Sequence, residues 1–203
     1  MTHYDVIIVG AGPAGLICAE TLSSSGLGVL ILEKKKVFGE KVCAGGLTRK
    51  DMAILDVPDD IIEHKITNTA VFSRKRKSQT NAPEAFVFTV NRVALGNWQK
   101  DRLKKTQVEI RNNSKVTKIE TDKVVVNDIE EIGFKYLVGA DGYFSVVRKY
   151  LGIPQEKRLI GIQYTVPDPV KDPRLEIHLN AKRFFSWYGW KFPHEDSFAV
   201  GCC

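Results

Sequence analysis

Three glycines near the start of the chain, Gly10, Gly12 and Gly15, form a GxGxxG pattern that can hold a phosphate group. The apolar run Tyr4–Val9 before them predicts a buried strand, and a helix is expected from Pro13 to Ser25. The first glycine permits the tight turn, the second lets the backbone approach a pyrophosphate, and the third lets helix and strand pack closely. The free N–H groups at the helix start then face the phosphates.

An acidic residue stands where this fingerprint requires one. The apolar run Val29–Leu32 predicts a second buried strand and is followed at once by Glu33, about 20 residues beyond the glycines. A carboxylate at that strand end can accept hydrogen bonds from ribose hydroxyls. This combination of two strands, three glycines, a helix and an acidic residue predicts an adenine dinucleotide site. It does not decide between NAD and FAD.

The composition is that of an ordinary globular protein of 203 residues, 43% hydrophobic and 27% charged. No apolar run approaches the roughly 18 residues of a membrane span, and the early first strand leaves no room for a signal peptide, which favours the cytoplasm. The net charge of +6 includes two basic clusters, Lys34–Lys36 and Arg74–Lys77, which we expect to be solvated loops or edges, with contact to an anionic membrane surface or to a phosphate as the alternative. No nucleic-acid motif accompanies the charge, and the four cysteines lack zinc-site spacing, so no metal is expected.

The order of the remaining elements indicates an α/β fold with two interleaved parts. Further helices are expected at 48–55, 92–105 and 144–151, and strands at 66–73, 85–90, 108–110, 116–120, 124–127 and 134–138. Alternating runs at 160–166, 175–179 and 184–192 predict antiparallel strands. We therefore predict a Rossmann-like, three-layer β/β/α dinucleotide domain over 1–65 and 91–155. A mostly antiparallel substrate domain over 66–90 and 156–203 would cover the reactive end of the cofactor.

A second turn, residues 139–142, follows one of these strands and carries the sequence Gly-Ala-Asp-Gly. The Asp141 carboxylate can hold a ribityl or ribose hydroxyl and Gly142 permits close approach; the alternative is a plain strand-to-helix turn. With Ser145 and Arg148 it resembles the second FAD motif of the glutathione-reductase-type flavoproteins, in the form seen in flavin monooxygenases and geranylgeranyl reductases. The resemblance implies that the dinucleotide is FAD.

Two further stretches are similar to the geranylgeranyl reductases, which lie close to the p-hydroxybenzoate-hydroxylase-like group. Lys41–Leu47 resembles a cysteine-containing, glycine-rich loop of that family, and Tyr188–Pro193 resembles its YxWxFP motif, which lines the apolar cavity for the isoprenoid chain. The resemblance makes Cys43, Tyr188 and Trp190 candidate catalytic residues. The alternatives are a small packing residue for the cysteine and a strand with one aromatic face for the motif.

The same resemblance implies which residues contact FAD. Arg92 opens a helix and matches an arginine that approaches the flavin in the family, or is an ordinary surface residue; Val116 opens a strand whose backbone meets the adenine. The candidate cofactor-binding residues are Gly10, Ala11, Gly12, Pro13, Ala14, Gly15, Glu33, Lys34, Lys41, Cys43, Ala44, Gly45, Arg92, Val116, Ala140, Asp141 and Gly142.

The resemblance implies an FAD-dependent oxidoreductase that reduces carbon–carbon double bonds of geranylgeranyl groups in lipids, quinones or chlorophyll precursors. NAD(P)H or a reduced ferredoxin-like protein would donate the electrons, and a prenylated lipid or quinone substrate would bring peripheral membrane contact. A monooxygenase or halogenase of the same fold, or an incomplete FAD-binding fragment that needs a second chain, are the alternatives. The Gly-Asp dipeptide of the family's third FAD motif is absent, so we expect a chain that is truncated at its C-terminus and a fold that is incomplete there.

Overall fold

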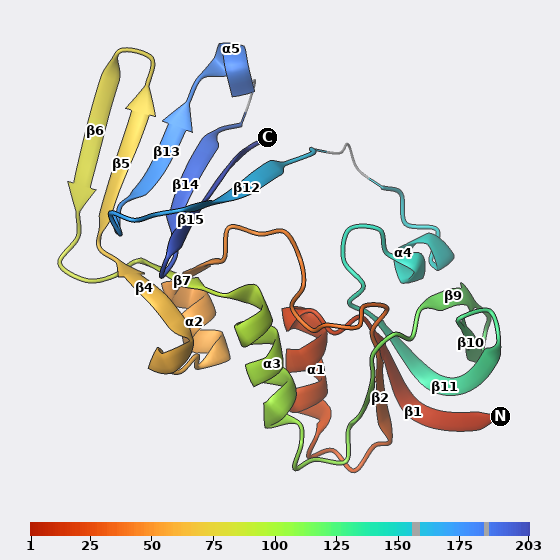
Figure 1. The fold of residues 1–203 in the computed structure, drawn as a ribbon. Coiled ribbons are helices and arrows are strands. Elements are labelled where there is room, and N and C mark those ends of the chain that lie inside the picture. The colour runs from red at the N-terminus through yellow and green to blue at the C-terminus, as the bar shows by residue number, and fades with distance from the viewer. Residues whose placement is uncertain (156–158, 185–186) are drawn as a thin grey trace. The chain divides into compact units, whose positions relative to one another are not determined.

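The structure is a computed structural model that describes residues 1–155, 159–184 and 187–203 (Figure 1). The chain divides into two compact units, each formed by two separate stretches. Unit 1 consists of Met1–Glu40 and Val93–Glu156, and unit 2 of Lys41–Arg92 and Lys157–Cys203. The two units are thus interleaved along the chain, and residues 41–65 group with unit 2.

Unit 1 is built on a six-stranded sheet with the order β8-β2-β1-β11-β10-β9. Its strands are β1 (Thr2–Val9), β2 (Val29–Leu32), β8 (Glu109–Arg111), β9 (Val116–Ile119), β10 (Lys123–Val126) and β11 (Glu130–Gly139). The four strands β8, β2, β1 and β11 run parallel, whereas β10 and β9 are antiparallel additions. Helices α1 (Pro13–Leu22), α3 (Arg92–Arg102) and α4 (Val146–Tyr150) accompany the sheet.

Both faces of this sheet are buried, which explains why its central strands are continuous apolar runs. Side chains alternate between the faces along a strand. Ile7 and Val9 of β1 therefore join a core with β9, β10, β11 and Val147 of α4. Val6 and Ile8 point the other way and pack with Leu16 and Ala19 of α1. Figure 1 shows α1 and α3 together on that second side. The predicted Rossmann-like arrangement is thus confirmed.

Unit 2 contains a six-stranded sheet of order β12-β15-β14-β13-β5-β6 and a three-stranded sheet of order β3-β7-β4. The large sheet comprises β5 (Asn68–Ser73), β6 (Arg76–Asn81), β12 (Ile162–Pro167), β13 (Leu175–Leu179), β14 (Gly189–Pro193) and β15 (Ser197–Cys202). The small sheet comprises β3 (Gly46–Thr48), β4 (Ile62–Ile66) and β7 (Val87–Val90). All neighbouring pairs are antiparallel except β5 and β13, which are parallel, so the expected mostly antiparallel sheet is confirmed.

Helices α2 (Arg49–Leu55) and α5 (Ala181–Phe184) and the short 3-10 helix η1 (Asp59–Ile61) complete unit 2. A capping box starts α2: the Thr48 hydroxyl accepts from the Asp51 N–H, and the Asp51 carboxylate accepts from the Thr48 N–H. None of the helices in the described part of the chain has both the length and the apolar character that a membrane crossing needs.

Three local expectations differ from the structure. The run expected as one strand over 66–73 is split, because β4 ends at Ile66 in the small sheet and β5 starts at Asn68 in the large one. Between the strands expected at 66–73 and 85–90 the structure has a further strand, β6, whose residues are all exposed and therefore show no apolar alternation. The run expected over 184–192 includes residues 185–186, which lie outside the described residues; its described end forms β14.

Candidate functional site

The two sequence motifs of unit 1 meet at the carboxyl ends of three neighbouring parallel strands. Val9 lies beside Leu32 on β2 and beside Gly139 on β11. The Gly10 N–H donates to the Leu32 carbonyl at 2.8 Å, and the Ala140 N–H donates to the Val9 carbonyl at 2.8 Å. The glycine turn, Glu33 and the Asp141 turn are therefore side by side, at the sheet edge where open α/β sheets bind ligands.

The glycines are required for different reasons. Gly10 has φ of +100°, and a Cβ there would lie 2.5 Å from the Ala140 carbonyl oxygen. A Cβ on Gly15 would lie 2.0 Å from the Gly10 carbonyl oxygen, so strand and helix approach too closely for any side chain. A Cβ on Gly12 would meet no atom of the described residues within 4 Å. The space above Gly12 is thus left open by the protein itself.

The N-terminus of α1 faces this space with its backbone donors. Gly12 is the N-cap residue and provides no side-chain cap, Pro13 follows it, and the first turn holds no acidic residue. The first N–H groups of a helix have no partner inside the helix and carry the positive end of its dipole. An uncapped start with no carboxylate beside it suits a phosphate group.

Glu33 is held in place by the glycine turn. Its Oε2 accepts a hydrogen bond from the Ala11 N–H at 2.7 Å, and its Oε1 accepts from the Lys35 N–H at 2.9 Å. A carboxylate has about four acceptor positions, so both oxygens keep capacity for ribose hydroxyls. Lys34, the neighbouring candidate, has an exposed side chain.

The two carboxylate oxygens of Asp141 differ in their hydrogen bonding. Its Oδ2 accepts from the Val146 N–H at 2.6 Å, at the start of α4. Its Oδ1 is buried and has no hydrogen-bond partner among the described residues. A buried acceptor without a donor is costly and calls for an explanation. A ligand hydroxyl would satisfy it, so the residues present fit an adenine dinucleotide with a polyol chain such as FAD.

Two further candidates for FAD contact, Arg92 and Val116, differ from each other. Arg92 starts α3, and its Nε is buried without a partner among the described residues, so this donor is also available to a ligand. Val116 is 4% exposed and its side chain packs in the core beside Val126. Only the Val116 backbone could therefore serve a cofactor.

In unit 2, the Cys43 loop and the aromatic strand β14 contact each other. Cys43 and Lys41 are exposed, whereas Gly45, with φ of +73°, is buried and its carbonyl accepts from the Val90 N–H at 3.0 Å. A Cβ on Gly46 would lie 2.5 Å from the Phe192 ring. The two stretches that carry the family resemblance are thus parts of one local structure.

Trp190 reaches the Cys43 loop through a residue that the sequence analysis did not single out. The Trp190 indole N–H donates to Gln163 Oε1 at 3.4 Å, and the Gln163 amide donates to the Cys43 carbonyl at 3.2 Å. The indole also covers Gly201, where a Cβ would lie 2.5 Å from its ring. No sequence signal marks Gln163, because a lone glutamine in a strand is typical of a solvated position.

Tyr188 belongs to an aromatic group beside this connection. Its ring stacks on Trp187 at 5.4 Å between centroids and meets the Trp190 ring edge-on at 6.1 Å. Tyr188 is half-buried, whereas 42% of Trp187 is exposed. Flat aromatic rings with an exposed member offer an apolar surface that needs no polar partner.

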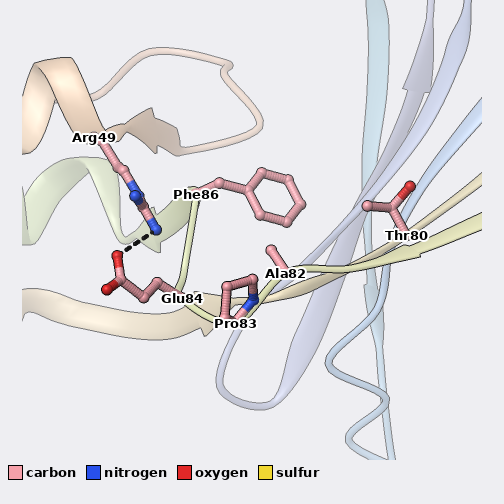
Figure 2. Close-up of a pocket in the computed structure, with 6 residues that line it drawn as sticks. All are labelled: Arg49, Thr80, Ala82, Pro83, Glu84 and Phe86. Atoms are coloured by element: carbon pink, nitrogen blue, oxygen red, sulfur yellow. Dashed lines mark ion pairs between the residues drawn. The ribbon is translucent and has the colours of Figure 1, made fainter.

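An open pocket of about 640 Å³ lies elsewhere in unit 2, between α2 and the segment that leads into β7 (Figure 2). It is lined by Arg49, Thr80, Ala82, Pro83, Glu84 and Phe86, none of which is a sequence-predicted site residue. Arg49 is paired with Glu84 at 2.9 Å and donates to the Ala85 carbonyl at 2.6 Å. The charge of its guanidinium is thus already compensated.

Comparison with known proteins agrees with this geometry. Residues 3–184 match the family model described as "FAD binding domain". The chain is 26% identical to the geranylgeranyl diphosphate reductase of Rhodobacter capsulatus, over 98% of this chain and 54% of that protein. It superposes with a TM-score of 0.80 and 22% identity on a geranylgeranyl bacteriochlorophyll reductase-like protein from Thermoplasma acidophilum, covering all of this chain and 56% of the other.

The fold is also shared with an enzyme that is named for another activity. A p-nitrophenol 4-monooxygenase from Pseudomonas putida superposes with a TM-score of 0.76 and 19% identity, over 100% of this chain and 58% of that enzyme. The chain spans about half the length of the curated reductases it matches. Because the family model covers nearly the whole chain, the protein belongs to the FAD-binding domain family, and its expected resemblance to the geranylgeranyl reductases is confirmed.

Proposed function

We propose that the protein is, or is part of, an FAD-dependent oxidoreductase that reduces carbon–carbon double bonds of geranylgeranyl groups in lipids, quinones or chlorophyll precursors. The observation that carries this proposal is the local structure of unit 2, where the Cys43 loop packs on the aromatic strand through Gly46 and Phe192. Flavin binding alone is common to reductases and monooxygenases. Two relatives that match over nearly the whole chain are named geranylgeranyl diphosphate reductase and digeranylgeranylglycerophospholipid reductase.

In this proposal unit 1 binds the cofactor. The uncapped start of α1 takes the pyrophosphate, Glu33 accepts from the adenosine ribose, and the free oxygen of Asp141 accepts from a hydroxyl of the ribityl chain. Arg92, the first residue of α3, has a buried Nε with no partner among the described residues and is proposed to donate to the cofactor. Bound FAD supplies hydride-transfer chemistry, which protein side chains do not provide.

Unit 2 supplies the substrate side. Tyr188 and Trp187 offer flat apolar surface to a polyprenyl chain, which has no polar groups to pair. Trp190 acts chiefly as a positioning residue, because its indole N–H is engaged by Gln163, which in turn holds the Cys43 carbonyl. The exposed thiol of Cys43 is the proposed proton donor to the alkene carbon that does not receive hydride.

The electron donor and a membrane contact are further parts of the proposal. A nicotinamide or a reduced ferredoxin-like protein would reduce the cofactor. The exposed basic cluster Arg74–Lys77 spans the turn between β5 and β6 and the first two residues of β6, and it suits the anionic surface of a membrane that holds a prenyl lipid. Binding to anionic vesicles but not to neutral ones, lost on replacing these four residues by serine, is the expected result.

The test of the reductase proposal uses the purified chain titrated with FAD. Reduced anaerobically with dithionite and mixed with a geranylgeranyl lipid, the bound cofactor should regain its absorbance at roughly 450 nm as a double bond is saturated. Cys43→Ser should slow this step, while Cys18→Ser, at a half-buried thiol of α1, should not. No reoxidation by any prenyl lipid would refute the proposal, and hydroxylation of an aromatic substrate with oxygen would identify a monooxygenase instead.

A further inference from the structure

A histidine in the turn after β14 links three separate stretches of unit 2. Its Nε2 lies 3.1 Å from the Ala44 carbonyl oxygen in the Cys43 loop, and its Nδ1 lies 2.5 Å from Glu63 Oε2 on β4. This residue is His194, whose side chain is 14% exposed, against 18% for Glu63. The sequence pattern singles out neither residue.

The protons of this pair follow from the acceptors that surround it. A carbonyl oxygen can only accept, so Nε2 of His194 must carry a proton and donate to Ala44. Nδ1 and the Glu63 carboxylate then have to share one further proton, because two bare lone pairs at this distance would repel. The Nε2 bond to the Ala44 carbonyl and the Nδ1 contact with Glu63 are therefore made by the same ring at the same time.

The orientation of the His194 ring is fixed from several sides. His64, next to Glu63 on β4, donates from Nε2 to the His194 carbonyl at 3.0 Å. The His194 N–H donates to the Ser197 carbonyl at 2.7 Å. The ring also lies against Gly45, where a Cβ would be 2.9 Å from His194 Cε1. A ring that is fixed in this way can hold the backbone it contacts in one conformation.

We propose that His194, oriented by Glu63, is a positioning residue that fixes the conformation of the Cys43–Gly46 loop. Gln163 donates to the Cys43 carbonyl and His194 to the Ala44 carbonyl, so side chains hold two successive carbonyls of the loop by hydrogen bonds. The value of this for catalysis rests on the proposed function, in which the loop presents its thiol to the substrate. The anchoring itself is independent of any substrate and is tested without one.

The experiment measures amide hydrogen exchange by NMR on the uniformly labelled full chain without FAD or substrate. The Val90 amide is the reporter, because it donates to the Gly45 carbonyl in the loop. His194→Phe keeps an aromatic ring and removes both ring nitrogens, so exchange of Val90 and of the β3 amides should rise about tenfold. Amides of β1 in unit 1 should not change.

Two variants separate anchoring from general packing. Glu63→Gln can donate its amide to Nδ1 of a neutral His194 that still donates to Ala44, so exchange should stay within about twofold of wild type; Glu63→Ala should behave like His194→Phe. The matched control is His178→Phe, at a second histidine–glutamate pair on β13, where the ring lies 3.0 Å from Glu176. That variant should leave the Val90 amide unchanged.

A second measurement holds even where a variant fails to fold. In the wild-type chain, long-range ¹⁵N spectra of the His194 ring should show a protonated Nε2. An unprotonated Nε2, or Val90 exchange that is the same in His194→Phe and wild type, would overturn the proposal. A confirmed anchor in a chain that reduces no prenyl lipid would instead refute the reductase proposal and leave the anchor standing.

Discussion

Asp141→Asn should weaken FAD binding while leaving the fold almost untouched. The Oδ2 atom of Asp141 accepts from the Val146 N–H, and an asparagine oxygen can make the same bond. The Oδ1 atom is buried and unpartnered among the described residues. In the variant an NH₂ group replaces that acceptor, so a ligand hydroxyl loses a charge-assisted hydrogen bond and gains a neutral one.

The size of the effect follows from the two kinds of bond. A hydrogen bond to a charged group contributes about 1.5–3 kcal/mol and a neutral one about 0.5–1.5 kcal/mol. The difference of about 1–1.5 kcal/mol corresponds to a Kd for FAD that is about 5- to 13-fold higher. Without FAD, the free energy of unfolding should change by less than about 0.5 kcal/mol, since the bond to Val146 remains.

Flavin fluorescence titration gives the Kd, and urea denaturation of the cofactor-free protein gives the free energy of unfolding. Asp168→Asn is the matched control, because this buried aspartate of unit 2 also accepts backbone hydrogen bonds but uses both of its oxygens for them. It should cost stability and leave the Kd for FAD unchanged. An Asp141→Asn protein that binds FAD as tightly as wild type would show that Oδ1 does not face the cofactor.

Three further outcomes follow from local geometry. Gly12→Ala should keep the free energy of unfolding within about 0.5 kcal/mol, because its Cβ meets open space, yet raise the Kd for FAD; unchanged FAD affinity would mean that the phosphates do not approach there. Gly15→Ala should instead lower the free energy of unfolding by about 1–3 kcal/mol even without FAD, because its Cβ would lie 2.0 Å from a carbonyl oxygen. The hydrogen bond from the Arg174 guanidinium, and to a smaller extent the Lys191 ammonium, hold the pKa of Asp172 well below its usual range. This carboxylate therefore stabilises the fold above about pH 4 and loses that contribution as the pH falls further. Asp172→Asn should therefore cost about 1–2 kcal/mol at pH 7 and progressively less below pH of about 4 in urea denaturation; a cost that does not depend on pH would contradict this assignment.

The fold of unit 1 could be predicted because its signals are local. The continuous apolar runs of β1 and β2 reflect a sheet that is buried on both faces. The glycine turn and Glu33 have the fixed spacing of one strand–helix–strand unit. Even the meeting of the Asp141 turn with the glycines follows once β11 is taken as the parallel neighbour of β1.

Unit 2 was harder to predict because its determinants are non-local. Thr67 separates two strands that belong to different sheets, and no periodicity marks that change. The exposed strand β6 lacks an apolar face, so its sequence is that of a loop. Gln163 and His194 matter through contacts with residues more than a hundred positions away. A pattern confined to one window of sequence cannot contain such pairings.

The parallel seam between β5 and β13 has a consequence for how the chain folds. It joins residues 69–73 to residues 175–179. The second stretch of unit 1, Val93–Glu156, lies between these two strands in the sequence. Closing so long a loop carries an entropic cost that must be met before the seam gains any contacts, and sheets of this kind form slowly. During synthesis, the β5 edge of the β5–β6 hairpin therefore stays unpaired until β13 has been synthesised. Unit 1 needs only residues up to about 150 for its sheet and α4, so it can fold first and hold the two halves of unit 2 near each other.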